Sequence, residues 1–198
     1  MSDIAQLWPG SFCMTFSPKG CQIPDQVDGW TIHGLWPSES IYCNKTWRLT
    51  HKDIDDLQAN LSHYWPSLTK INSFKFWEKE WHKHGTCAAC ADSMSSPHKY
   101  FSLALQLRMK FTINEAFIAA GITPSCDNSY TLEHLHSALT DLGTHVILPV
   151  LQKLRCLGGP HGRGDTVVTW LTSINRSSAD WLEAVARRAS GKFRLAGF

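Results

Sequence analysis

The sequence lacks the features that would place it in a membrane or along an extended nucleic-acid tract. No apolar run approaches the roughly 20 residues that a transmembrane helix needs. Acidic and basic side chains nearly cancel, leaving a formal net charge of +2 over 198 residues, so we expect no broad cationic face. Any contact with nucleic acid should therefore be local and made in a cleft. No internal repeat or low-complexity segment is present, and the length suits one well-filled domain.

Residues 1–6 contain no basic stretch followed by an apolar one, so they do not predict a signal peptide. Seven cysteines, in contrast, are many for a cytosolic chain of this size. Asn-x-Ser/Thr triplets at Asn44, Asn60 and Asn175 agree with export and glycosylation. We expect a secreted or lysosomal protein whose leader is absent from this chain.

The most informative stretch is residues 74–87, F-K-F-W-E-K-E-W-H-K-H-G-T-C. At 3.6 residues per turn, its aromatic side chains Phe74, Trp77 and Trp81 share one face of a helix and predict that this face is buried. Gly85 is predicted to end the helix, because glycine adopts the left-handed conformation most easily.

Three polar side chains gather on a neighbouring face of the same helix. Glu80 and His84 are four residues apart and so lie one above the other, with Lys83 beside them. A carboxylate, an ammonium group and an imidazole on one turn suit the handling of an anion. The alternative is an ordinary amphipathic helix with a charged outer face.

A second stretch, residues 30–37 (W-T-I-H-G-L-W-P), predicts a strand that runs into a turn. His33 is followed by Gly34, which would let a ligand approach the backbone. For His33 taken alone, the alternative is a structural histidine at a strand end whose hydrogen bonds are satisfied within the fold. Together with His84, it suits acid–base chemistry from two sides of a phosphodiester.

Residues 30–37 and 80–87 closely resemble the two active-site segments of the ribonuclease T2 family of secreted and lysosomal acid ribonucleases. The resemblance is clearest over residues 5–142. It implies an α+β fold, in which a central, mostly antiparallel sheet is packed by several helices in a disulfide-stapled single domain. It also implies a monomeric endoribonuclease that acts on single-stranded RNA without a cofactor or metal, with neither DNA nor a membrane as a partner.

The resemblance assigns roles to the polar groups. His84 would be the base that removes the 2′-hydroxyl proton, and His33 the acid that protonates the departing 5′-oxygen, leaving a 2′,3′-cyclic phosphate. Glu80 and Lys83 would support the charge that builds on the phosphoryl oxygens. Histidine suits both proton transfers because its ordinary pKa is about 6.5.

Substrate-binding residues follow from the same resemblance, with two departures. Lys79 stands where family members often have a phosphate-binding histidine. Trp36 and Phe76 match aromatic positions that sandwich a nucleobase, and Tyr42 is a further candidate; core packing is the alternative for the first two. Because stacking tolerates every base, we expect low base specificity. Ser38 replaces a common acidic residue that bonds the base edge, so the resemblance does not predict which base is preferred.

Two disulfides are implied by the resemblance, Cys13–Cys21 and Cys43–Cys87. The second would fasten the segment after His33 to the end of the His84 helix and hold both histidines in one cleft. The resemblance leaves three cysteines unassigned: Cys90, Cys126 and Cys156.

Other elements are predicted from periodicity and capping residues. They are a strand over 7–13, a helix that begins after Thr50 and ends before Pro66, and helices from 100 onward, over 114–120 and over 132–142. Thr50 and Thr131 are the predicted N-caps, and Gly121 and Gly143 are the predicted stops.

The last quarter of the chain departs from the family pattern. Residues 158–165 form a glycine-rich basic linker, followed by a predicted strand over 167–171 and a predicted helix over 179–189. We therefore expect a ribonuclease T2-like domain over 1–157 and a divergent segment over 158–198 that packs poorly.

Two rival interpretations remain. His82, His84, Cys87 and Cys90 include a Cys-x-x-Cys pair and could bind zinc, but the two histidines are two apart on a helix and point to different sides. The second rival is a catalytically impaired variant of the fold that acts as an RNA- or protein-binding module. The presence of both histidines, Glu80 and Lys83 argues against it.

Overall fold

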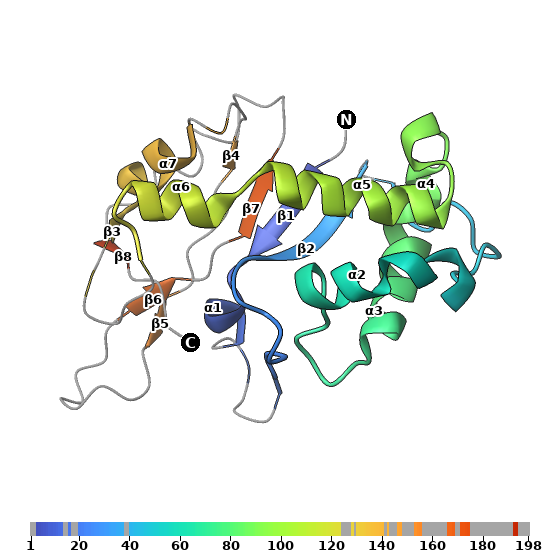
Figure 1. Cartoon of the computed structure of the whole chain (residues 1–198), viewed down its shortest axis with the longest axis horizontal. Coiled ribbons are helices and arrows are strands. Elements are labelled where there is room, and N and C mark those ends of the chain that lie inside the picture. The colour runs from blue at the N-terminus through green and yellow to red at the C-terminus, as the bar shows by residue number, and fades with distance from the viewer. Residues whose placement is uncertain are drawn as a thin grey trace.

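The computed structural model describes residues 3–13, 16, 20–37, 40–123, 128, 130–140, 142, 146–147, 153–155, 166–168, 171–174 and 192–193. Its central element is a four-stranded sheet in the order β2–β1–β7–β4, with helices packed around it (Figure 1). All three pairings in this sheet are antiparallel. The prediction of an α+β fold with an antiparallel sheet and several helices is confirmed.

The sheet joins segments from both ends of the chain. Its strands are β1 (Asp3–Leu7), β2 (Thr31–Trp36), β4 (Val146–Ile147) and β7 (Leu171–Ile174). Ile4 of β1 lies opposite Leu35 on one side and Ile174 on the other. Two small ribbons pair β3 (Tyr130–Thr131) with β8 (Lys192–Phe193) and β5 (Lys153–Arg155) with β6 (Thr166–Val168).

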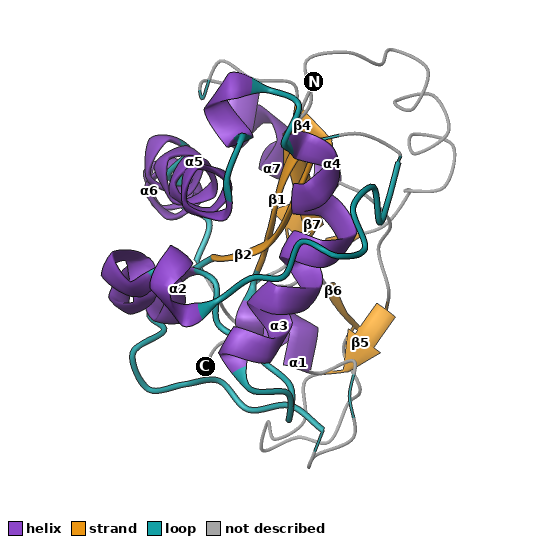
Figure 2. Cartoon of the chain, turned by 90° about the vertical axis from the view of Figure 1, so that its right-hand side faces the viewer, coloured by secondary structure: helices purple, strands orange, loops and turns teal. Residues whose placement is uncertain are grey.

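Helices α5 and α6 follow one another along one face of the sheet (Figures 1 and 2). The helical elements are α1 (Pro9–Cys13), η1 (His51–Asp53), η2 (Asp55–Leu57), α2 (Gln58–Tyr64), α3 (Ser73–Glu80), η3 (Trp81–Gly85), α4 (Thr86–Ala88), η4 (Asp92–Met94), α5 (Pro97–Lys110), α6 (Ile113–Ala119) and α7 (Leu132–Thr140). Of the helices in the described part of the chain, none is both long and apolar enough to cross a bilayer.

Two apolar clusters hold these elements together. The larger one packs α2, α3, η3 and α5 against the sheet around Trp65, Trp77, Trp81, Tyr100 and Phe101. The smaller one joins Trp8 and Trp30 to α6 and α7. The indole nitrogens of Trp77 and Trp81 donate to the carbonyls of Trp65 (2.7 Å) and Trp47 (3.2 Å). Much of the tryptophan content is therefore core.

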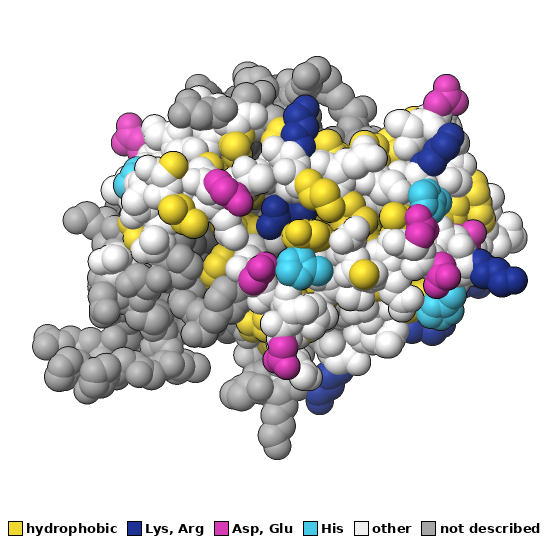
Figure 3. All heavy atoms as spheres, in the orientation of Figure 1, with side chains coloured by type: hydrophobic (Ala, Val, Ile, Leu, Met, Phe, Trp, Pro, Cys, Tyr) yellow, Lys and Arg dark blue, Asp and Glu magenta, His cyan; other side chains and the backbone are white. Residues whose placement is uncertain are grey.

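The surface carries no patch of one sign on the face shown in Figure 3. There, the acidic and basic side chains of the described residues are interspersed. This agrees with the small net charge.

The first predicted strand is wrong in its position. The strand ends at Leu7, and the next residues form α1, whereas a strand was expected over 7–13. Pro9 is the first residue of α1, where its fixed backbone angle and missing N–H are favourable. The Phe12 N–H donates to the Trp8 carbonyl at 3.0 Å, which closes the turn.

The other predicted helices lie close to their expected places. Thr50 does cap a turn, since its backbone N–H and hydroxyl both contact the Asp53 carboxylate, but two short 3₁₀ turns precede α2. Gly121 follows α6 with φ of 70°, as a stop glycine requires. The Thr131 hydroxyl accepts from the His134 N–H at the start of α7.

Among the described residues there are two disulfides, and they are the pairs that the resemblance implies. Cys13 joins Cys21, and Cys43 joins Cys87. Cys90 is an exposed free thiol. Cys126 and Cys156 lie outside the described residues.

Part of the C-terminal quarter belongs to the sheet. The strand expected over 167–171 is divided between β6 and β7, and β7 lies between β1 and β4. The poor packing expected for residues 158–198 therefore does not extend to 171–174, which pair with β1 along their whole length. The linker 158–165 and the helix expected over 179–189 lie outside the described residues.

Candidate active site

The predicted catalytic residues come from two elements that meet beside the sheet. β2 supplies His33 and Trp36, while the end of α3 and the η3 turn supply Glu80, Lys83 and His84. The η3 turn is wider than an α-helix, with the hydrogen-bond spacing of a π-helix. Such turns are frequent at functional sites because they redirect side chains from the regular helical spacing.

Gly85 does not end this helix, contrary to the prediction. Its backbone is right-handed, with φ of −61°, and the chain continues directly into α4. A glycine is needed here because a Cβ at this position would clash with the Trp81 ring. Glycine here lets the η3 turn close over the buried indole.

Gly34 was predicted to leave room for a ligand, but its missing Cβ leaves room for two neighbouring side chains instead. A Cβ on Gly34 would lie 2.5 Å from the Trp36 indole nitrogen and 3.1 Å from one Glu80 carboxylate oxygen. The space that we expected a ligand to use is filled by these two side chains. Gly34 therefore lets the Glu80 carboxyl lie directly against β2, between the two histidine-bearing elements.

The two predicted catalytic imidazoles both lie close to one indole. The Trp36 ring centroid is 5.3 Å from that of His33, nearly perpendicular to it, and 6.1 Å from that of His84. His84 is only 8% exposed. The tertiary structure thus brings together residues that are 51 positions apart in the sequence.

Burial and Lys83 tune the titration of this group. Burial lowers the pKa of His33, and the positive charge of Lys83 lowers it further. Burial, Lys83 and then His33 lower the pKa of His84 to about 4. Burial raises the pKa of Glu80 to about 7, against the opposing effect of Lys83. In mildly acidic solution the site therefore holds a neutral His84 and a protonated Glu80.

Several buried polar atoms in the site have no hydrogen-bond partner among the described residues. They are Nδ1 of His33, Nδ1 of His84 and Oε2 of Glu80. Buried polar atoms in proteins nearly always have partners. Three such atoms in one place indicate a site that is completed by a polar ligand.

Tyr100 supports the site from α5 and was not identified from the sequence. Its buried hydroxyl donates to the Leu35 carbonyl of β2 at 2.7 Å. Burial and the nearby Glu80 carboxylate both raise its pKa, so it stays protonated and keeps donating. The helical pattern of the sequence places Tyr100 in a helix, but such a pattern does not reveal which strand a side chain contacts.

The loop after β2 is attached to the η3 turn. The Tyr42 N–H donates to the Lys83 carbonyl at 2.8 Å, and the Tyr42 ring lies 5.3 Å from that of His82. Tyr42 is 43% exposed and has φ of 58°, a left-handed conformation that is unusual for a tyrosine. The adjacent Cys43–Cys87 disulfide holds this loop against the end of the turn.

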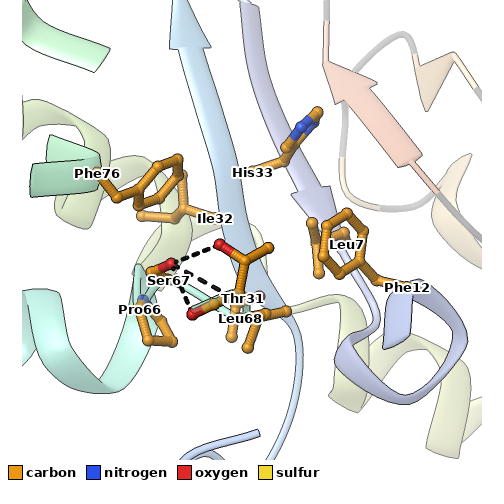
Figure 4. Close-up of a pocket in the computed structure, with 10 residues that line it drawn as sticks. Leu7, Phe12, Thr31, Ile32, His33, Pro66, Ser67, Leu68 and Phe76 are labelled. Atoms are coloured by element: carbon orange, nitrogen blue, oxygen red, sulfur yellow. Dashed lines mark hydrogen bonds between the residues drawn. The ribbon is translucent and has the colours of Figure 1, made fainter. Parts of the chain in front are cut away.

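A pocket of about 100 Å³ lies beside His33 (Figure 4). Phe76 stands on one side of it, and Leu7 and Phe12 stand on the other. Ser67 and Thr69 add hydroxyl groups to its wall, and their side-chain oxygens lie 3.2 Å apart. The pocket therefore combines an aromatic wall with polar groups that could recognise the edge of a base.

The two aromatic residues predicted to sandwich a base differ in their neighbours. Phe76 lines the pocket beside His33, whereas Trp36 is not part of the pocket lining and lies close to both imidazoles. No ring contact joins Trp36 to Phe76 within the described residues, and a base held between two rings would itself keep them apart. Their sandwich stays a prediction.

Lys79 is exposed, and no hydrogen bond or ion pair within the described part of the chain ties it to the two histidines. Ser38 lies outside the described residues.

The arrangement does not favour the zinc alternative. Cys87 is bonded to Cys43 and so has no thiolate to offer a metal. In the ranges that the structure describes, no three His, Cys, Asp or Glu side chains come together as a metal site would require.

Comparison with known proteins places the chain in a family. Residues 2–158 match the model of the Ribonuclease T2 family. The chain is 40% identical to ribonuclease T2 of Danio rerio over 137 residues, covering 69% of this chain and 55% of that protein. It is 39% identical to ribonuclease Oy of Magallana gigas over 154 residues, covering 73% of this chain and 70% of that protein.

The fold is also similar to that of solved ribonucleases. RNase NT in complex with 5′-AMP aligns over 100% of this chain and 98% of its own, with a TM-score of 0.77 and 25% identity. The present chain spans little more than half the length of the Danio rerio relative. With the family model matching residues 2–158, the chain belongs to the ribonuclease T2 family.

Proposed function

We propose that this protein is an endoribonuclease that cleaves single-stranded RNA by metal-independent transesterification. The observation that carries the proposal is the pair of histidines, His33 and His84, whose rings lie 5.3 Å and 6.1 Å from the ring of Trp36. Each has a buried Nδ1 without a hydrogen-bond partner among the described residues. Two imidazoles facing one space can transfer protons at both ends of a single displacement on phosphorus.

His84 acts as the base. With a pKa of about 4 it is neutral in mildly acidic and neutral solution, and so can accept the proton of the RNA 2′-hydroxyl. The 2′-oxygen attacks the phosphorus, and the bond from phosphorus to the 5′-oxygen breaks. His33 donates its proton to the departing 5′-oxygen, leaving a 2′,3′-cyclic phosphate and a free 5′-hydroxyl.

His33 must be protonated to act as the acid. In the free protein, Lys83 and burial lower its pKa. A bound phosphodiester carries a negative charge that opposes the effect of Lys83 and so raises the pKa of His33. Substrate binding therefore favours the protonated form of His33, which the acid role requires.

Glu80 and Lys83 stabilise the charge on the phosphoryl oxygens. Lys83 supplies a positive charge. Because the pKa of Glu80 is about 7, its carboxyl is protonated in mildly acidic solution and can donate a hydrogen bond to a non-bridging oxygen. Lys79, exposed on the same helix, contributes a more distant contact to phosphate.

Aromatic side chains bind the bases next to the cleaved bond. The pocket with Phe76, Ser67 and Thr69 lies beside His33, the proposed acid, and so receives the base of the departing nucleotide. Trp36, close to the proposed base His84, and Tyr42 stack on the preceding base. Stacking accepts every base, so specificity should be low, and Trp36→Ala should mainly raise KM.

DNA should not be cleaved because it lacks the 2′-hydroxyl that attacks phosphorus. We propose a monomer that acts in the secretory pathway, outside the cell or in the lysosome. The two disulfides support this location, because disulfides persist in oxidising compartments. Asn44, the first residue of an exposed sequon, accepts hydrogen bonds from the Thr46 N–H and hydroxyl and is a candidate glycosylation site.

The test is an RNA-cleavage assay on purified protein in the presence of EDTA, with analysis of the product ends. Cleavage of single-stranded RNA to 2′,3′-cyclic phosphate ends, with single-stranded DNA left intact, is the expected result. Full inhibition by EDTA or cleavage of DNA would contradict the mechanism. RNA binding without cleavage would support the catalytically impaired alternative.

A further inference from the structure

The wall of the pocket opposite Phe76 continues into a second aromatic surface that the proposed reaction does not use. Phe12 forms part of this wall, next to Leu7 (Figure 4). The ring of Phe16 lies 4.9 Å from that of Phe12, tilted by 52°. Phe16 is 39% exposed, which is high for a phenylalanine.

Both rings belong to residues with local backbone hydrogen bonds. The Phe12 N–H donates to the Trp8 carbonyl at 3.0 Å, and the Phe16 N–H donates to the Cys13 carbonyl at 3.1 Å. Cys13 is joined to Cys21 by a disulfide. Phe12, directly before Cys13, therefore needs little ordering when it binds a ligand.

The same disulfide is tied to the polar wall of the pocket. Cys21 forms an isolated antiparallel bridge with Thr69, and the Gln22 N–H donates to the Leu68 carbonyl at 2.9 Å. Thr69 and Leu68 both line the pocket. The aromatic pair adjoins the pocket through Phe12, which lines the pocket and packs against the ring of Phe16.

We infer that Phe12 and Phe16 form an additional base-binding subsite, which receives the second nucleotide on the 3′ side of the cleaved bond. This inference rests on the proposed function. His33 serves the leaving group, so the first departing base occupies the pocket. The next base along the strand is then directed to the aromatic pair. An exposed aromatic ring beside a nucleic-acid cleft binds bases by stacking.

The experiment uses chimeric oligonucleotides with a single ribonucleotide, so that only one bond can be cleaved. One substrate carries one deoxynucleotide after the ribonucleotide, and a second carries two. A third carries one deoxynucleotide on each side. In the native protein we expect kcat/KM to rise about tenfold between the first and second substrates, as stacking of one base would give. The kcat/KM of the third substrate should not show the same rise over that of the first.

Phe16→Ala should reduce the ratio of kcat/KM for the two-deoxynucleotide and one-deoxynucleotide substrates to near one, and Phe16→Tyr should restore it. Ile118→Ala is the matched control, because Ile118 is also an exposed apolar side chain (66% exposed) but lies on α6. It should keep the native ratio. An unchanged ratio in Phe16→Ala, or no rise in the native protein, would overturn the inference.

Binding of all-deoxy dinucleotide and trinucleotide gives a readout that does not need cleavage. The native protein should bind the trinucleotide about tenfold more tightly, and Phe16→Ala should lose this difference. If the ribonucleotide substrates are not cleaved but the binding difference and its loss are observed, the subsite stands and the proposed catalysis fails. If the substrates are cleaved but neither the rise in kcat/KM nor the tighter binding of the trinucleotide is observed, the subsite fails and the proposed function stands.

Discussion

At the scale of single residues, the site depends on titratable groups that are largely buried. Burial favours the neutral form of each group, so it lowers the pKa of His84 to about 4 and raises that of Glu80 to about 7. The charge of Lys83 acts downward on the pKa of His33, Glu80 and His84. The resulting set is a neutral base, a neutral carboxyl and a cation, which suits an anionic substrate better than three charged groups would.

Removing either histidine should therefore remove one proton transfer. We expect His33→Ala and His84→Ala each to lower kcat by at least about 100-fold in an RNA-cleavage assay. The double variant should lose little more than either single one, since both groups act in one step. His98→Ala, a surface histidine paired with Asp56, is the control. Near-normal turnover in His84→Ala would rule out its role as the base.

The raised pKa of Glu80 makes stability depend on pH. The folded protein holds this proton more tightly than the unfolded chain, in which the pKa is near 4.5. The stabilisation is therefore complete below pH 4.5 and is lost as the pH rises toward and past 7, where a buried carboxylate must ionise. Glu80→Gln avoids that cost and should be more stable than the native protein at pH 8, by up to about 3 kcal/mol, with no gain at pH 4.

Urea unfolding at both pH values measures this difference. Glu78→Gln is the matched control, because Glu78 pairs with Lys75 nearer the surface of the same helix. An equal gain for Glu80→Gln at pH 4 and pH 8 would mean that ionisation of Glu80 is not its cause.

At the scale of elements, the π-helical turn is the feature that aims the catalytic groups. Trp81 and His84 in this turn are both buried, and Gly85 gives the room that the Trp81 ring needs. The Cys43–Cys87 disulfide and the Tyr42 N–H bond fasten the neighbouring loop to it. A change in the turn should consequently affect both stability and catalysis.

Gly85→Ala tests this coupling. The added methyl group would overlap the Trp81 ring, and overpacking of this kind costs about 1–3 kcal/mol in the free energy of unfolding. We expect urea unfolding to show that loss and kcat to fall as well, because Lys83 and His84 move with the turn. Gly121→Ala should also lose stability, through its φ of 70°, but should keep its kcat. Full activity in Gly85→Ala would separate the turn from catalysis.

At the scale of the whole molecule, the sheet depends on a strand from the far end of the chain. β7 pairs with β1 on the side opposite β2, so both edges of β1 are covered. An uncovered β1 would expose backbone donors and acceptors and invite aggregation. The segment after the glycine-rich linker therefore contributes to the sheet that supports His33.

Limited proteolysis should cleave first between Gly158 and Thr166, because the glycine-rich sequence there favours an accessible chain. After cleavage, the C-terminal fragment should stay with the core during size-exclusion chromatography, since β7 is hydrogen-bonded to β1. It should separate only in denaturant. If this linker resists protease as well as the core does, the sequence-based boundary at residue 157 is wrong. If the fragment is released immediately after cleavage, the pairing of β7 with β1 is contradicted.

The sequence alone determined the parts of this protein that depend on local pattern. The two motifs, residues 30–37 and 80–87, were sufficient to expect the family, and periodicity was sufficient to place most helices. Thr131 and Gly121 act locally, on their own turns, and were read correctly for that reason. Local signals of this kind need no knowledge of the rest of the chain.

Only the tertiary structure decided the features that depend on contacts between distant segments. Gly85 looked like a helix stop, but its role is set by the buried Trp81 ring. Phe76 lines the pocket beside His33, and Trp36 lies against His33 itself, a contact between rings that the strand pattern of residues 30–37 did not predict. Tyr100 reaches β2 across 65 residues, and β7 joins β1 across the whole chain. Such contacts are selected by packing of the folded molecule, which a local pattern does not encode.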